Sequence, residues 1–135
     1  MKLSIFSNWT TDYHRLPSET GAVLEGIDAL GGTLIDVGLD HLAGLQSLHT
    51  LNLQGCKYIS DSGLQRLFHV AKTLRCLNLS GCVGVTHKGL PQLYNLQKLK
   101  ELDLRHTPGI RNHASSLAQL RFNIPHCHIQ EDDYC

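Results

Sequence analysis

Cysteine and histidine are the residue types in this chain best suited to holding a metal ion or acting as nucleophiles. The chain has five cysteines in 135 residues, among them Cys56 and Cys82 in similar surroundings, and a His126-Cys127-His128 run near its end. Zinc sites are usually recognised by closely spaced pairs such as CxxC, and no such pair is present. No Cys–His or Ser–His–Asp arrangement emerges from the sequence pattern either. We therefore predict no metal, no cofactor and no catalytic activity.

Each of these residues also has a structural interpretation, which we favour. Cys56 and Cys82 suit small buried positions in adjacent repeats. Cys76 is expected to point outward from the sheet. The alternative is a redox enzyme, which would use either a reactive thiol at Cys76 or a metal ion bound by the C-terminal run. The C-terminal run of metal-ligand residue types comprises His126, Cys127, His128, Asp132, Asp133 and Cys135.

The elements that position these residues form an internal repeat. Three segments align: LHTLNLQGCKYISDSGLQRL from Leu48, LRCLNLSGCVGVTHKGLPQL from Leu74, and LKELDLRHTPGIRNHASSL from Leu99. Their spacing of about 25 residues lies within the range of leucine-rich repeats and outside the ranges of ankyrin, TPR and propeller units.

Every repeat combines a short strand with a helical segment. Leu51 and Leu53 are two residues apart and face the core, so Asn52 must face the opposite way. Leu64 and Leu67 have the spacing of one helix face. The sequence therefore predicts an α/β leucine-rich-repeat solenoid of the cysteine-containing type. It would be a short right-handed arc, with parallel strands on its concave face and helices on its convex face.

The ends of the arc are expected to be atypical, because terminal repeats cap an open core. A fainter unit from Gly26 aligns Ile27 with Leu51 and uses Ile35 as its buried anchor. Residues 123–129 are expected to form a final strand. We predict a cap segment at 1–25, a repeat domain of about four repeats and a cap strand at 26–129, and an acidic tail at 130–135.

A wide polar surface is expected on the concave face. Such a surface suits protein recognition, and it is too open to exclude water as catalysis requires. Aromatic residues do not interleave with the basic ones, which argues against nucleic-acid binding. The candidate partner-binding residues are Asp28, Thr50, Asn52, Gln54, Cys76, Asn78, Ser80, Glu101, Asp103 and Arg105.

The N-terminal part carries motifs that no generic repeat demands, namely Trp9, Asp12-Tyr13, Leu16-Pro17 and Ile27-Asp28-Ala29. From about Trp9 to Ile129 the chain resembles the mitochondrial family that contains ATP synthase subunit s (coupling factor B) and the distal membrane-arm assembly component 2 of respiratory complex I. The resemblance implies a non-catalytic protein on the matrix side of the inner membrane. It would bind subunits or assembly factors and assist complex I assembly or ATP synthase coupling. The Gly-Cys form of the repeats favours the complex I branch.

Charge and targeting bear on this interpretation. Net charge is zero, but residues 1–47 and the tail are acidic whereas residues 48–121 are basic. We expect Lys88, Lys98 and Arg111 to form a basic flank that contacts the anionic inner membrane peripherally. No apolar run is long enough to span a membrane. The N-terminus has neither a signal peptide nor a transit peptide, so the mitochondrial assignment depends on the resemblance.

A second resemblance leads to a different function. The GCxxIxDxGLxxL phrase, which includes Cys56 and Leu64, is similar to the repeats of F-box substrate receptors. A substrate-recognition fragment of a ubiquitin ligase is therefore the alternative, although no F-box fits before Gly26.

Overall fold

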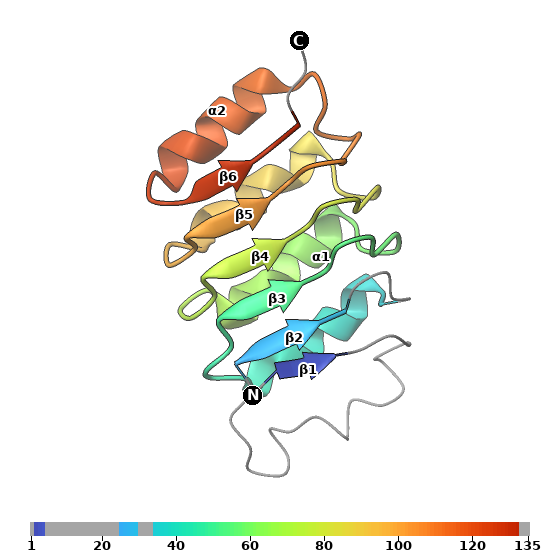
Figure 1. Cartoon of the computed structure of the whole chain (residues 1–135), viewed down its shortest axis with the longest axis vertical. Coiled ribbons are helices and arrows are strands. Elements are labelled where there is room, and N and C mark those ends of the chain that lie inside the picture. Colours follow the sequence, from blue (N-terminus) through green and yellow to red (C-terminus); the bar gives the residue numbers. More distant parts are fainter. Residues whose placement is uncertain (1, 5–24, 30–33, 133–135) are drawn as a thin grey trace.

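A parallel sheet forms one layer of the molecule in the computed structural model, which describes residues 2–4, 25–29 and 34–132. Six strands pair in sequence order from β1 to β6, and all of the pairs are parallel. Because neighbouring parallel strands need a crossover, the chain winds as a solenoid (Figure 1). The strands are β1 Lys2–Ser4, β2 Gly26–Asp28, β3 Thr50–Asn52, β4 Cys76–Asn78, β5 Glu101–Asp103 and β6 His128–Gln130.

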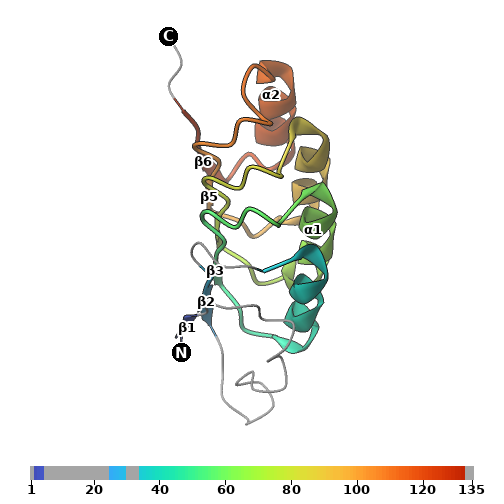
Figure 2. The ribbon, with the colours of Figure 1, turned by 90° about the vertical axis from the view of Figure 1, so that its right-hand side faces the viewer.

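Helical segments form the second layer and cover one face of the sheet (Figure 2). Three of the described segments are 3-10 helices. A 3-10 helix rises about 2.0 Å per residue against about 1.5 Å in an α-helix, so it crosses the layer with fewer residues. The segments are η4 Asp36–Gly44, α1 Asp61–Gln65, η5 Arg66–Val70, η6 His87–Asn95 and α2 Ala114–Asn123. The predicted α/β solenoid is confirmed.

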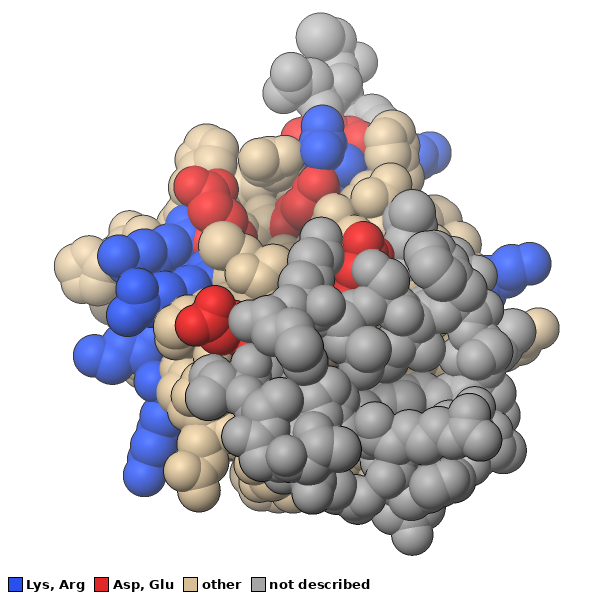
Figure 3. Space-filling model, turned by 60° about the horizontal axis from the view of Figure 1, so that its bottom comes forward, with Lys and Arg blue, Asp and Glu red and all other residues tan. Residues whose placement is uncertain are grey.

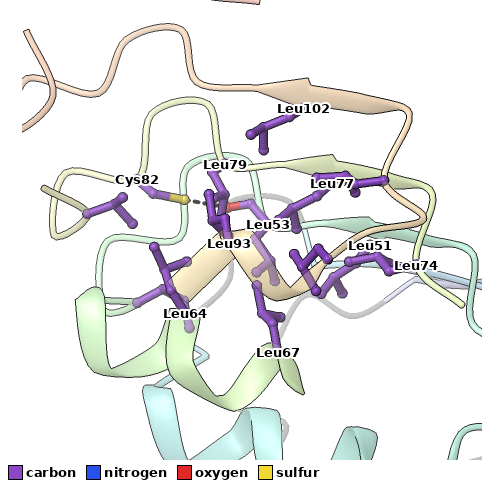
Figure 4. Packing of buried hydrophobic residues seen from close by; sticks show 14 of the residues in the cluster. Leu51, Leu53, Leu64, Leu67, Leu74, Leu77, Leu79, Cys82, Leu93 and Leu102 are labelled. Carbon is purple, nitrogen blue, oxygen red and sulfur yellow. Dashed lines mark hydrogen bonds between the residues drawn. The ribbon is translucent and has the colours of Figure 1, made fainter. Parts of the chain in front are cut away.

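One buried apolar residue at the centre of each strand from β2 to β6 forms the inner column of the core. Leu51 pairs in register with Leu77, and Leu77 with Leu102, and all three are buried. Figure 4 shows leucines of the strand layer packed against Leu67 and Leu93 of the helical layer. Burying each such side chain contributes about 1.5–3 kcal/mol. The predicted strand register is confirmed.

The first described repeat differs from the sequence prediction in its anchor. Leu34 is fully buried, whereas Ile35 is 39% exposed, so the prediction for Ile35 was wrong. Leu34 precedes Leu39 by five positions, as Ile59 precedes Leu64. Leu34 follows Ile27 of the strand by seven positions, however, whereas Ile59 follows Leu51 by eight. The repeat is therefore one residue shorter before its helix, and this shift moves the anchor. The predicted cap segment 1–25 lies outside the described residues apart from β1 and Glu25, and the domain boundaries stay predictions.

The last repeat also departs from the prediction. A single strand over 123–129 was wrong for most of its length, because α2 extends to Asn123 and β6 begins only at His128. Ile124 is buried where the helix ends, and Pro125 lies in the turn that follows. The apolar side chain of Ile124 thus closes the core beneath a helix end and does not mark a strand.

Carboxylates at the start of two helical segments join neighbouring repeats. Asp36 accepts hydrogen bonds from the backbone N–H of Ser60 at 2.7 Å and from its hydroxyl at 2.5 Å. Asp61 accepts the equivalent bonds from Thr86 at 2.7 and 2.5 Å. Ser60 and Thr86 each precede a helical segment, where backbone N–H groups lack partners within the helix. Each carboxylate therefore caps the next repeat rather than its own.

Close approach to these carboxylates requires glycine. A Cβ at Gly63 would lie 2.3 Å from Oδ1 of Asp36, and one at Gly89 the same distance from Oδ1 of Asp61. The third repeat has His87 in place of the aspartate, and its ring stacks on that of His113 with centroids 3.6 Å apart. This contact of a carboxylate with the next repeat, which we call the carboxylate junction, occurs twice in the described residues and is followed by a junction of a different kind.

Candidate functional site: the concave face

The sheet face opposite the helices, which we call the concave face, carries two columns of polar side chains. The column at the strand starts contains Thr50, Cys76 and Glu101, which are paired in register. The column at the strand ends contains Asn52, Asn78 and Asp103, again in register. Alternation along each strand puts the buried leucine between them on the other side of the sheet. The predicted columns are thereby brought together.

A shallow groove of about 540 Å³ runs across these strands. Its lining includes side chains of both columns and the strand backbone between them. The groove is broad and open, a shape that suits an extended protein surface rather than a small enclosed substrate. Its lining residues are Thr50, Leu51, Asn52, Cys76, Leu77, Asn78, Glu101, Leu102, Asp103 and Gln130.

The strand-end column also bends the backbone. The side-chain oxygen of Asn52 accepts the N–H of Gln54 at 3.0 Å, and that of Asn78 accepts the N–H of Ser80 at 2.9 Å. Short polar side chains commonly hold turns in this way. The side-chain amide of Asn52 donates to Asp28 at 3.1 Å, which links two repeats. Much of the hydrogen-bonding capacity of this column is therefore used within the protein.

Asp103 is the most strongly held member of the column. Arg105 donates to it from the backbone at 3.0 Å and from the guanidinium at 2.7 Å. Burial alone would raise the pKa of Asp103, but these bonds outweigh it and the pKa lies below its usual value. The charge of Asp103 on the concave face is therefore neutralised by Arg105. Glu101, exposed in the other column, offers a carboxylate that forms no ion pair with the other described residues.

The structure removes one residue from the predicted binding surface and adds another to it. Ser80 is only 4% exposed, so its assignment to the binding surface was wrong. The same bend is present at Gln54 and Arg105, whose longer side chains stay exposed, whereas the short Ser80 is covered. Gln130 lines the groove from β6 and was missed. The alternation of His128, buried Ile129 and Gln130 could have indicated it. Gln54 and Arg105 are exposed beside the column.

The predicted basic flank is divided between two edges. Lys88 lies in the first turn of η6, whereas Lys98 lies in the turn after η6 ends at Asn95. Arg111 belongs with Lys88, because Gly109 forms a bridge with Thr86. The structure therefore brings Lys88 and Arg111 to the edge where the strands end, and Lys98 to the edge where they begin.

Both repeat cysteines fill structural positions. Each thiol donates across the turn to the preceding repeat, Cys56 to the carbonyl of Ala29 at 3.1 Å and Cys82 to that of Leu53 at 3.0 Å (Figure 4 shows the second). Burial raises the pKa of Cys82 to about 12, so the reactive thiolate is scarce at neutral pH. Cys76 is half-buried on the concave face.

The C-terminal run lies where the last turn enters β6. Among the described residues, no group of three or more histidine, cysteine or acidic side chains is arranged to hold a metal ion. Burial raises the pKa of Cys127 to about 11, which disfavours the thiolate that metals bind. Asp133 and Cys135 lie outside the described residues. Of the helices that the structure describes, none has the length and apolarity to cross a membrane.

Comparisons with known proteins identify similar chains. A family model described as Leucine Rich repeat matches residues 44–68 and 70–90. The mitochondrial ATP synthase subunit s of Rattus norvegicus is 37% identical over 111 residues, covering 77% of this chain and 54% of the relative. That of Bos taurus is 30% identical over 131 residues, covering 92% of this chain and 64% of the relative. The chain thus spans about half the length of the first of these relatives.

The fold also has a counterpart among solved structures. The crystal structure of the Rad7 and Elc1 complex in yeast contains a chain that superposes with a TM-score of 0.60 at 18% sequence identity. The match covers 79% of this chain and 27% of the other. At that level of identity, the likeness shows the fold alone.

Proposed function

We propose that this chain, a leucine-rich-repeat homologue of mitochondrial ATP synthase subunit s, is a non-catalytic accessory protein that binds an oxidative-phosphorylation complex through its concave face. The relatives' name supports a mitochondrial location and makes ATP synthase the first complex to test. Assembly of the membrane arm of complex I is the second. Placement on the matrix side of the inner membrane belongs to the same proposal.

The groove across β3, β4 and β5 is the observation that carries this proposal. It presents hydroxyl, amide, thiol and carboxylate groups on a rigid sheet, with the exposed Thr50 and Glu101 at its rim. Rigid, mixed-polar concave surfaces are what repeat proteins use to bind other proteins. The groove is open along its length, so it does not provide the water-excluded site that electrostatic catalysis requires.

A ubiquitin-ligase receptor fragment has less support. The residues behind that alternative, such as Cys56 and Leu64, serve the core of the repeat. The relatives with 30–37% identity carry the name of the ATP synthase subunit.

Blocking the groove tests the proposal. Thr50→Arg with Cys76→Arg places two bulky cations in the groove, and Gln65→Arg with Gln119→Arg places the same charge on the exposed helical layer. The chain is incubated with detergent-solubilised ATP synthase or complex I and run on native gels. Comigration of the unmodified chain with one complex is expected. The groove variant should lose at least about tenfold in affinity, equivalent to about 1.4 kcal/mol, and the helical variant should bind normally.

Two results would contradict the proposal. The first is that the chain comigrates with neither complex. The second is equal loss in the groove variant and the helical variant, because that would place the binding surface elsewhere. Thermal melts of both variants check that each is folded.

A further inference from the structure

Four cations gather on the edge where the strands begin. We call this set the basic edge, and it consists of Lys72, Arg75, Lys98 and Lys100. All four are exposed, and they lie on two adjacent turns, 71–75 before β4 and 96–100 before β5. The two turns are in direct contact, because the carbonyl of Arg75 accepts the N–H of Lys100 at 2.7 Å. The strands begin on the left in Figure 1, and Figure 3, which keeps left and right unchanged, shows Lys and Arg side chains gathered on that left side.

The carboxylates that the structure describes leave the basic edge without a neutralising ion pair. Elsewhere in the described residues, Arg66 pairs with Asp40, Arg105 with Asp103 and Arg121 with Glu131. Within the described part of the chain, no carboxylate pairs with any of the four cations of the basic edge. Like charges held close together repel one another and create a positive potential that attracts anions.

The basic edge is continuous with the groove. Arg75 and Lys100 directly precede Cys76 and Glu101, which line it. A partner lying in the groove and extending past the strand starts would therefore contact the four cations. We propose that the basic edge binds an acidic segment of the protein partner, an inference that rests on the proposed function for the groove itself.

A protein segment fits this surface better than a membrane. The cations flank a hollowed groove, which an extended chain can follow and a flat bilayer cannot enter. Membrane-binding surfaces commonly add large apolar side chains to the basic ones. The two turns themselves carry no exposed large hydrophobic residue, and the exposed Phe68 and Phe122 lie on the neighbouring helical segments.

A matched pair of double variants tests the inference on the full chain. Lys98→Gln with Lys100→Gln removes two charges from the basic edge, whereas Lys57→Gln with Lys88→Gln removes two exposed lysines from elsewhere. The probe is a short fluorescent polyglutamate peptide followed by anisotropy. We expect binding at about 0.01 M salt that is lost near 1 M. The basic-edge variant should bind about fivefold more weakly, and the control variant within twofold of the unmodified chain.

Contradicting outcomes are defined by the same measurements. The inference fails if the peptide does not bind, if both double variants lose equally, or if cardiolipin-containing vesicles bind the basic edge while the peptide does not. The last outcome would assign the edge to a membrane. The Thr50→Arg, Cys76→Arg variant should bind the peptide at least as tightly as the unmodified chain does, while its affinity for the respiratory complex falls. Failure of the groove proposal and failure of this inference are thereby distinguishable.

Discussion

The two carboxylate junctions and the histidine junction that follows them join similar repeats by different chemistry. In the first two, Asp36 and Asp61 each accept two hydrogen bonds from the residue before the next helical segment. In the last, His87 stacks on His113, and no described residue forms a hydrogen bond with its buried Nδ1. Charge-assisted hydrogen bonds are roughly twice as strong as neutral ones, whereas a stacked aromatic pair contributes only about 0.5–1.5 kcal/mol. The C-terminal repeat should therefore be the more weakly coupled one.

The largest expected effect concerns the core that both kinds of junction share. Leu77→Ala removes a buried side chain from β4, the middle strand of the groove, and should lower the free energy of unfolding by about 2–5 kcal/mol. Asn78→Ala, the matched control on the opposite sheet face, loses the hydrogen bond that it accepts from the Ser80 N–H and a long exposed one that it donates to Gln54. It should lower the free energy of unfolding by about 0.5–1.5 kcal/mol. Urea unfolding measures both. Equal losses would contradict the strand register.

A carboxylate junction should be sensitive to a single methyl group. Gly89→Ala places a Cβ against Oδ1 of Asp61 and must displace that carboxylate from Thr86, so we expect a loss of about 1–3 kcal/mol. Gly44→Ala is the control, because a Cβ there meets no atom within 4 Å. If urea melts show that both substitutions are tolerated alike, the carboxylate junction does not determine stability.

The first junction should also make stability depend on pH. Burial alone would raise the pKa of Asp36, but hydrogen bonds from Ser60 and Ser62 outweigh it, so the pKa lies below its ordinary value. A group with a depressed folded-state pKa stabilises the protein fully above its unfolded pKa of about 3.9 and loses that contribution as pH falls through the folded-state pKa. Asp36→Asn should lower the free energy of unfolding by about 1–2 kcal/mol at pH 7 and by less at pH 3. A difference that does not change between these pH values would refute this account.

The smallest effect is expected at the last junction. His87→Gln removes the ring stack with His113, and aromatic pairs contribute about 0.5–1.5 kcal/mol. The lower part of that range applies because both rings are only partly buried. Replacement of the exposed His126 by Gln is the control. A loss larger than that caused by Gly89→Ala would reverse the order of the two kinds of junction.

The parts of the fold that follow from local periodicity were predictable from sequence. Leu51 and Leu53 reveal a strand face because side chains alternate, and the same alternation identified most of the concave columns. Ser80 could not be placed, because it occupies the same repeat position as the exposed Gln54 and Arg105, and periodicity does not distinguish the three. The contact of Asp36 with Ser60 also escaped prediction. It joins positions 24 residues apart whose side chains meet only once two repeats stack.

The carboxylate junction also determines how this architecture can grow by gene duplication. The unit from Leu48 to Thr73 contains both halves of the junction, since Ser60 receives the preceding carboxylate and Asp61 supplies the next. A tandem copy of this unit would meet itself through the same bonds, with Gly63 already providing the space. The unit from Leu99 has Asn112 at the corresponding place and supplies no carboxylate there. Duplication of the unit from Leu48 is therefore favoured over duplication of the unit from Leu99.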